Sequence, residues 1–460
     1  MRKSKKLEFL KERTNQLNLL KRITPNYFLL FLMVLCFFLY SLWAIVIPFG
    51  QAPDEIQRYD VGNFIFKYHE LPVAGDERLF YGGYGTTYAT TPYLPYLLGG
   101  ILMIVMNFLF NIENLYLVPR LISVISGVFS VFLVFKICKG LKLDTNLNYF
   151  VTSLFAFVPG YAFVNSYVNQ DSFAILVNLF VVFTWVKGKQ EGWLIKNYVY
   201  TGIGLALCLL TYLNGYIIIP VTVMLLLFHY FQKKQSGFWK KLLFLMIPIL
   251  VISGWFFVRN YIIYDGDMLG VSYSKQLSEK LASEEMKPSN RLTMQRQGVS
   301  IGEMLTDRGW LVGTYRSFWG TFGHMDTAFP LSFYIRISTL HFIALLGFIS
   351  LSIKPLQKMI FSKKEKLENA YRNSIFLALF LLIPLAFMLS IYYSYTSDFQ
   401  YQGRYVYTAL FPIILFSCLG ISRLITPKLR SWVYVIAVTA LFFLNLYAVF
   451  KLLLPSYYPI

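Results

Sequence analysis

The sequence predicts an all-α polytopic membrane protein with about eleven transmembrane helices. Of its 460 residues, 57% are hydrophobic and only 14% are charged, and the mean hydropathy is +0.54. These values exclude both a soluble domain and a disordered chain. Short basic clusters between the apolar runs account for the net charge of +19, because cytoplasmic loops of membrane proteins are rich in Lys and Arg. A lipid bilayer is therefore an expected partner, and nucleic acid is not.

Each predicted span is an apolar run of roughly the length that crosses a bilayer as a helix. We place the spans at residues 26–48, 118–137, 146–164, 172–187, 198–213, 215–231, 240–258, 331–353, 373–395, 404–423 and 430–454. The run from Tyr198 to Phe231 is too long for one crossing, and the sequence "LNG" at Leu213–Gly215 predicts a turn that divides it into two short helices.

The basic segments predict the topology. The run Pro92–Phe110 is apolar enough to cross the membrane, but counting it as a span would place the basic segment Lys136–Lys142 outside and reverse every later basic loop. We therefore expect 92–110 to lie in the membrane interface. The N-terminus and the basic loops are then cytoplasmic, and the C-terminus is outside.

This topology divides the chain into four regions. We expect a cytoplasmic basic tail at 1–25, a transmembrane module at 26–259, an extracytoplasmic loop at 260–330 and C-terminal transmembrane helices at 331–460. The transmembrane module includes a first extracytoplasmic loop at 49–117, which contains the predicted interfacial helix.

Acidic and basic side chains lie at the predicted outer ends of the spans. Asp54 follows the first span in "FGQAPDEIQRYD", and Asp171 precedes another; a carboxylate there is costly without a partner or a function. Arg120, Arg259 and Arg404 occupy matching positions, and a guanidinium group can bind phosphate through two parallel hydrogen bonds. Ion pairs with the two aspartates are the alternative role. Acids and arginines together at the outer face suit a lipid-linked phosphate substrate.

Aromatic residues and the absence of other motifs limit the function further. We expect most of five tyrosines in the first outer loop to belong to an interfacial aromatic belt, with stacking on sugar rings as the alternative. These are Tyr81, Tyr84, Tyr88, Tyr93 and Tyr96. The sequence has no Walker-type glycine loop, no His pair at zinc-binding spacing and no nucleophile elbow, so no residues support an ATPase or a hydrolase.

Six segments carry a resemblance to a known superfamily. They are "APDEIQRYD", "VPRLISVISGVFSVFLVFKI", "SYVNQDSFAILVNLFVV", "SGWFFVRNYIIYDGDMLG", "SFWGTFGHMD" and "YQGRYVYTALFP", in that order between residues 52 and 412. In this order the chain resembles bacterial membrane glycosyltransferases of the GT-C superfamily that use polyprenyl-phosphate sugars. It is similar to the protein mannosyltransferase and lipid A aminoarabinose transferase families, and most similar to a largely uncharacterised branch.

The resemblance implies a GT-C fold with juxtamembrane helices in the first outer loop, and a site outside the bacterial cell membrane. The implied activity is inverting transfer of a hexosyl or pentosyl group from an undecaprenyl-phosphate type donor. The implied acceptor is a glycan or a teichoic-acid-like polymer of the cell envelope. By position, Asp54 matches the catalytic aspartate with Glu55 beside it, and Asp171 matches the second acidic motif. The three outer arginines would then bind the donor phosphate.

The same motifs suggest residues that contact the substrate. They are Arg58, Trp319, His324, Asp326, Gln402 and Tyr405, and Tyr84 of the first outer loop is a further candidate. Arg58 departs from the pattern, because the branch usually has a histidine three residues after the glutamate of "PDE". This substitution weakens the case for a metal in the first loop. A divalent metal ion is the one cofactor that the resemblance leaves open.

The predicted chemistry is proton removal from an acceptor hydroxyl by Asp54 while arginines stabilise the departing phosphate. Partial burial would raise the pKa of Asp54 toward neutrality, which suits a base. Two other functions remain open. A polysaccharide polymerase or ligase uses similar donors but usually lacks an acidic motif directly after the first span. A transporter of lipid-linked sugars is the third, although the sequence lacks the internal repeat typical of transporters.

Overall fold

A computed structural model describes residues 25–112, 114–233, 237–361 and 363–459, and these residues form a helical bundle with two short strands. The predicted basic tail at 1–25 lies outside the described residues except for Pro25. Within the described part, nine helical segments are long and apolar enough to cross a membrane. They are α2 (Pro25–Val46), α5 (Leu117–Gly140), α8 (Asp171–Glu191), η1 with α10 (Leu213–Ile217, Ile218–Lys233), α11 (Phe238–Ile263), α15 (Leu331–Phe361), α16 (Lys363–Thr396), η3 with α17 (Gly403–Ala409, Leu410–Leu424) and α18 with η4 and α19 (Pro427–Tyr447, Ala448–Leu453, Leu454–Tyr457).

The two remaining predicted spans form shorter helices. The segment 146–164 is not one helix, because α6 (Thr145–Ala156) ends before Pro159, which begins the six-residue α7 (Pro159–Val164). Val158 is extended, as expected for a residue before proline. The other segment forms α9 (Ile195–Leu209), which has 15 residues. The chain does break between the two short helices, but at residues 210–212; Leu213–Gly215, where the turn was predicted, already begins η1.

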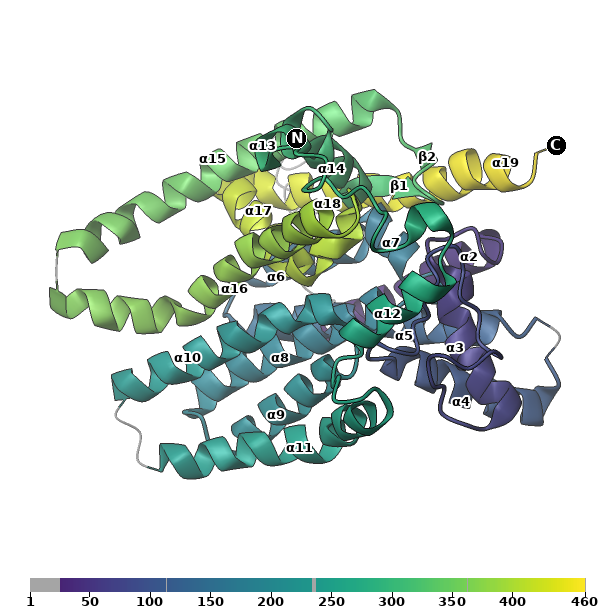
Figure 1. Cartoon of the computed structure of the whole chain (residues 1–460). Coiled ribbons are helices and arrows are strands. Elements are labelled where there is room, and N and C mark those ends of the chain that lie inside the picture. Colours follow the sequence, from purple (N-terminus) through teal and green to yellow (C-terminus); the bar gives the residue numbers. More distant parts are fainter. Residues whose placement is uncertain (1–24, 113, 234–236, 362, 460) are drawn as a thin grey trace.

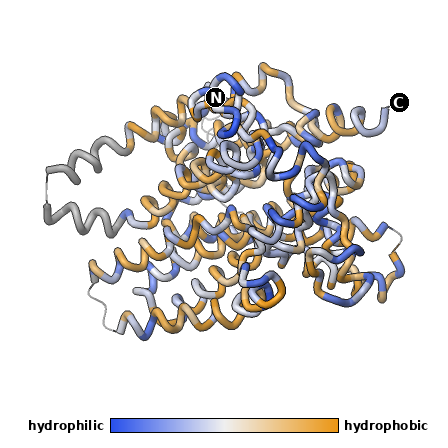
Figure 2. Tube along the Cα trace, in the orientation of Figure 1, coloured by the Kyte–Doolittle hydropathy of each residue, from blue (hydrophilic) through white to orange (hydrophobic). Residues whose placement is uncertain are grey.

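One end of the bundle carries the first outer loop and the segment 260–330. In Figure 1, α3 (Glu55–Tyr68), α12 (Val271–Leu281) and the C-terminus lie at this end, and the facing ends of α10 and α11 lie at the opposite one. We call the first of these the outer end, because the basic segments predict it to be extracytoplasmic. Figure 2 shows hydrophobic residues along the long helices and hydrophilic residues gathered around α12.

Helix α4 (Leu94–Phe110) corresponds to the ambiguous apolar run and has 17 residues. It packs against α3 through two glycines, and a Cβ at Gly100 would lie 2.6 Å from the Gly62 carbonyl oxygen. This close approach holds α4 beside α3 at the outer end (Figure 1), as expected for a helix in the first outer loop.

The segment 260–330 is largely structured and packs on the first outer loop. It contains α12, η2 (Glu284–Met286), α13 (Ile301–Thr306), α14 (Trp310–Gly320) and an antiparallel hairpin of β1 (Thr321–Phe322) and β2 (Thr327–Ala328), in which Thr321 pairs with Ala328. The hydroxyl of Ser278 in α12 donates to the Tyr84 carbonyl at 2.7 Å. The two outer segments therefore form one cover over the outer end of the bundle.

Candidate active site

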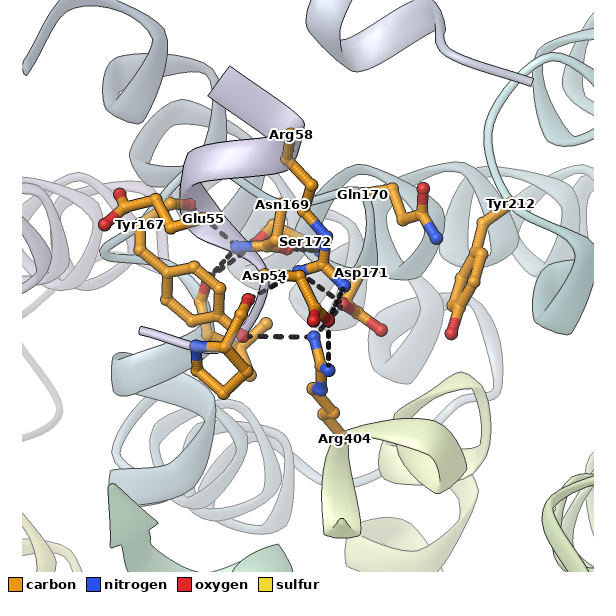
Figure 3. A network of polar contacts seen from close by, with 12 residues as sticks. Asp54, Glu55, Arg58, Tyr167, Asn169, Gln170, Asp171, Ser172, Tyr212 and Arg404 are labelled. Atoms are coloured by element: carbon orange, nitrogen blue, oxygen red, sulfur yellow. Dashed lines mark hydrogen bonds and ion pairs between the residues drawn. The ribbon is translucent and has the colours of Figure 1, made fainter. Parts of the chain in front are cut away.

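Four charged side chains meet at the outer end, and they come from three separate segments. Asp54 precedes α3, Arg58 lies in the first turn of α3, Asp171 begins α8 and Arg404 lies in η3. Figure 3 shows the two guanidinium groups approaching from opposite sides, with the two carboxylates between them. The closest nitrogen–oxygen distances to Asp54 are 3.1 Å from Arg58 and 3.0 Å from Arg404, and those to Asp171 are 4.0 and 3.5 Å. We call these four residues the Asp–Arg network.

Local backbone structure presents the two carboxylates. Asp54 adopts a left-handed conformation (φ 58°, ψ 12°) directly before α3, which an aspartate tolerates better than most residues. Arg58 is four residues further on, so both side chains lie on one face of the first helical turn. Asp171 is the first residue of α8, where the helix dipole favours negative charge.

The network is buried except at Asp54. The side chains of Arg58, Asp171 and Arg404 are 2%, 2% and 5% exposed, whereas that of Asp54 is 40% exposed. Within the part of the chain that the structure describes, neither carboxylate oxygen of Asp171 accepts a hydrogen bond. A molecule that enters the site therefore reaches Asp54 first.

The direction predicted for the Asp54 pKa is wrong. Burial raises it, but the positive charges of Arg58 and Arg404 outweigh burial and lower the pKa of Asp54 to about 2. The carboxylate is therefore ionised throughout the physiological range while both arginines contact it.

One of the five tyrosines of the first outer loop contacts the network, and two others are buried in the bundle. The Tyr88 hydroxyl accepts a hydrogen bond from Arg58 at 3.3 Å, and burial raises the pKa of Tyr88 to about 12. Tyr93 and Tyr96 are each 1% exposed, and Tyr96 donates to Gln170 at 2.9 Å. The belt interpretation is thus wrong for these two buried residues, because the first outer loop folds back onto the bundle.

Glu55 and Arg120 form a separate buried pair, which argues against their predicted catalytic and phosphate-binding roles. The guanidinium group contacts Glu55 through two hydrogen bonds of 2.7 Å and also donates to the carbonyls of Ala44 and Ile47 at the end of α2. Glu55 further accepts from the backbone N–H of Val168 at 3.1 Å. The side chains of both partners are 1% exposed or less, so the pair ties α2, α3 and α5 together away from solvent.

The structure does not bring Arg259 into the network. Its guanidinium group donates to the carbonyls of Leu71 and Pro72 at 3.4 and 2.9 Å, which fastens the first outer loop to α11. A role for Arg259 in the phosphate site therefore requires a change in this contact.

Three other predicted substrate residues lie in or beside the hairpin. His324 and Asp326 are exposed in the turn between β1 and β2, and His324 Nε2 lies 3.1 Å from the Gly50 carbonyl oxygen. The hairpin thus contacts the loop that leads to Asp54. Trp319 is 3% exposed and lines an apolar cavity of about 620 Å³ between α14 and α15.

Gln402 and Tyr405 contact Arg404, and Tyr84 contacts Asp398 nearby in the sequence. Gln402 accepts from Arg404 Nε at 2.6 Å, and the Tyr405 hydroxyl accepts from Arg404 Nη2 at 3.3 Å. Sequence reasoning missed two further residues there, Asp398 and Gln400. Asp398, Gln400 and Gln402 are polar residues at every second position of the non-helical segment before η3. This alternation, which places side chains on one face of an extended chain, is the signal that could have identified them.

The residues of the site do not fit a divalent metal ion. Among the described residues, no group of three or more His, Cys, Asp or Glu side chains is arranged to hold a metal. Asp54 and Asp171, the two carboxylates of the network, each face two guanidinium groups, which are cationic at all relevant pH values. Arginine therefore supplies the positive charge at this site.

The arrangement of the helices is similar to that of membrane glycosyltransferases of known structure. The oligosaccharyltransferase of Archaeoglobus fulgidus in its apo form is 14% identical, with a TM-score of 0.50 over 94% of this chain and 55% of that one. The same enzyme, AglB, in complex with an inhibitory peptide and a dolichol-phosphate gives 14% identity and a TM-score of 0.50 over 93% and 55% of the two chains. This chain thus spans about half the length of the archaeal enzyme.

ArnT from Cupriavidus metallidurans bound to undecaprenyl phosphate is 12% identical, with a TM-score of 0.39 over 87% of this chain and 78% of that one. No family model and no curated protein matches the sequence. The likeness in fold confirms the predicted class: the chain is a multi-pass membrane protein with a GT-C fold.

Proposed function

We propose that the protein is an inverting glycosyltransferase that moves a sugar from a polyprenyl-phosphate donor to an extracytoplasmic glycan or cell-envelope polymer. The observation that carries this proposal is the Asp–Arg network, which gathers one partly open carboxylate and two arginines at the outer end of a membrane bundle. A phosphate with a membrane-embedded tail is a ligand that such arginines suit, and the open carboxylate is available to an acceptor.

Phosphate binding would change the state of the base. A donor phosphate competes with Asp54 for the guanidinium group of Arg404, which now contacts Asp54 at 3.0 Å. Once Arg404 turns to the phosphate, Asp54 loses part of the positive field that lowers its pKa. The pKa of Asp54 then rises, which makes it a stronger base only when the donor is in place. In the free protein, the same contact keeps the base inactive.

The transfer is a single displacement. The acceptor oxygen attacks the anomeric carbon on the side opposite the phosphate, and a new carbon–oxygen bond forms as the bond to the phosphate oxygen breaks. The acceptor proton passes to the Asp54 carboxylate, and the bonding electrons leave with the polyprenyl phosphate, whose charge Arg404 stabilises. Attack from the opposite side inverts the anomeric configuration. Asp171 holds Arg404 and Arg58 in position from the buried side.

The experiment measures release of polyprenyl phosphate by the purified protein in lipid nanodiscs. A panel of undecaprenyl-phosphate monosaccharides is compared with pyrophosphate-linked oligosaccharides, with cell-envelope polysaccharide as acceptor. We expect turnover of a phosphate-linked monosaccharide by the wild type. Turnover of the pyrophosphate-linked oligosaccharides alone would refute the proposal and favour a polymerase or ligase, and vectorial movement of intact lipid without cleavage would favour a transporter.

Asp54→Asn tests the base directly, because it keeps the shape of the side chain and removes its charge. We expect a loss of activity of about a hundredfold or more in a variant that still folds and accumulates. The matched control is Asp307→Asn, an exposed carboxylate in the segment 260–330 that accepts a hydrogen bond from the Thr306 hydroxyl at 2.8 Å. Near wild-type activity in Asp54→Asn would remove Asp54 from the mechanism.

A further inference from the structure

A line of hydrogen-bonded polar side chains extends from Arg404 to Asp398. Alternate residues of the unhelical segment between α16 and η3 carry it: Gln402 donates to Gln400 Oε1 at 2.8 Å, and Gln400 donates to Asp398 Oδ2 at 2.7 Å. Gln402 in turn accepts from Arg404 Nε at 2.6 Å. We call Asp398, Gln400 and Gln402 the amide strip.

Two tyrosines flank the amide strip. The Tyr405 hydroxyl donates to Gln400 Oε1 at 3.3 Å, and the Tyr84 hydroxyl lies 3.5 Å from Asp398 Oδ2. The side chain of Tyr84 is among the exposed aromatic residues, and all three strip residues are only partly buried. The strip and its tyrosines therefore form a surface that a ligand can reach, whereas the neighbouring Arg404 is almost fully buried.

We propose that the amide strip binds the hydroxyl groups of the donor sugar. The inference rests on the proposed function and identifies the residues that select the sugar. Amide side chains both donate and accept hydrogen bonds, and a carboxylate accepts them, so together they match adjacent sugar hydroxyls, which also do both. Tyrosine rings beside them offer an apolar surface to the C–H faces of a pyranose or furanose. Few other ligands present so many hydroxyls together with an apolar face.

Position assigns the strip to the donor and not to the acceptor. In a polyprenyl-phosphate sugar, the anomeric carbon is bonded directly to the phosphate, so the ring must lie next to the group that binds the phosphate. Gln402 contacts Arg404 directly and begins the strip there. Asp54, which meets the acceptor, contacts the neighbouring Nη2 of the same guanidinium group. The Tyr405 hydroxyl beside the strip bonds to that Nη2 as well, at 3.3 Å. The strip and Asp54 therefore meet at Arg404, as donor sugar and acceptor must when the acceptor attacks the anomeric carbon.

The test compares the affinity of nanodisc-embedded protein for two lipids, undecaprenyl phosphate and undecaprenyl-phosphate monosaccharides. We expect the wild type to bind one sugar-bearing lipid at least about tenfold more tightly than the bare lipid. Gln400→Ala should remove this difference and leave the affinity for undecaprenyl phosphate unchanged. Asp398→Asn is the second variant, because it alters one acceptor with no change in size. Gln297→Ala, an exposed glutamine in the segment 260–330, is the matched control and should keep the wild-type ratio.

Each other outcome overturns the inference in a recognisable way. If both strip variants keep the wild-type ratio, the strip does not bind sugar. If both affinities fall together, the strip only positions Arg404. If the wild type binds the two lipids equally well, the sugar adds nothing to the affinity and the strip does not bind it, while the proposed function stands. If the wild type binds neither lipid, the proposed function fails together with the inference.

Discussion

Replacing Arg404 by lysine separates a phosphate-binding guanidinium group from a simple counter-charge. Three different nitrogens of Arg404 are in use: Nη2 contacts Asp54 at 3.0 Å, Nη1 contacts Asp171 at 3.5 Å and Nε donates to Gln402 at 2.6 Å. A lysine carries the same charge on one nitrogen and cannot hold a phosphate by two parallel hydrogen bonds. If Arg404 binds the donor, Arg404→Lys should therefore lose most of its affinity for undecaprenyl phosphate.

The size of the loss follows from the contacts. A hydrogen bond to a charged group contributes about 1.5–3 kcal/mol, and every 1.4 kcal/mol is a factor of ten in affinity. Loss of one of two bonds to the phosphate should weaken binding by about tenfold to a hundredfold. Arg404→Ala should weaken binding at least as much. It should also lower stability, because it leaves the buried Asp171 with only Arg58 at 4.0 Å.

The assay is titration of undecaprenyl phosphate into the nanodisc-embedded variants, with unfolding temperatures measured in parallel. Arg308→Lys is the matched control, since Arg308 is half exposed and pairs with Glu303 outside the site. Asp54→Asn should bind undecaprenyl phosphate at least as well as the wild type, because Asp54 competes for Arg404. Wild-type affinity in both Arg404→Lys and Arg404→Ala would refute the assignment and make Arg259 the next candidate.

Three further predictions concern stability and topology. The pKa of Asp54 is about 2 instead of the usual 3.8, so its ion pairs should contribute stability that is fully present above about pH 4 and lost as the pH falls toward 2. The unfolding temperatures of the wild type and Asp54→Asn should therefore converge at low pH. Divergence there would contradict the lowered pKa. Glu55→Gln should destabilise the protein by about 3–5 kcal/mol because it leaves Arg120 buried without its charge partner. The double variant Glu55→Gln/Arg120→Met should recover part of this loss. Full stability with lost activity in Glu55→Gln would instead indicate a catalytic role. Cysteines introduced at positions 77 and 285 should react with an impermeant thiol reagent from outside, and a cysteine at position 196 should not. The background labelling should be low because the four native cysteines are buried. The reverse labelling would place the Asp–Arg network on the cytoplasmic side.

The membrane class and most helices could be predicted from composition and apolar length alone. A span needs only enough consecutive apolar residues, which is a local property of the chain. The one predicted span that is divided, 146–164, contains Pro159, whose effect on the preceding residue is also local. Asp54, Asp171 and Arg404 were recognisable for a similar reason, since a charge beside a long apolar run is costly and therefore conspicuous.

Which charged groups pair with one another was decided only by the tertiary structure. Asp54 and Arg404 are 350 residues apart, and Glu55 and Arg120 are 65 apart, so no local pattern distinguishes the open network from the buried pair. The same limit explains the wrong direction for the Asp54 pKa, because burial and opposite charges shift a carboxyl pKa in opposite directions. Sequence alone indicated burial at the membrane surface. In the tertiary structure, α3 and η3 each bring an arginine to Asp54, and the combined effect of these two positive charges on the pKa outweighs that of burial.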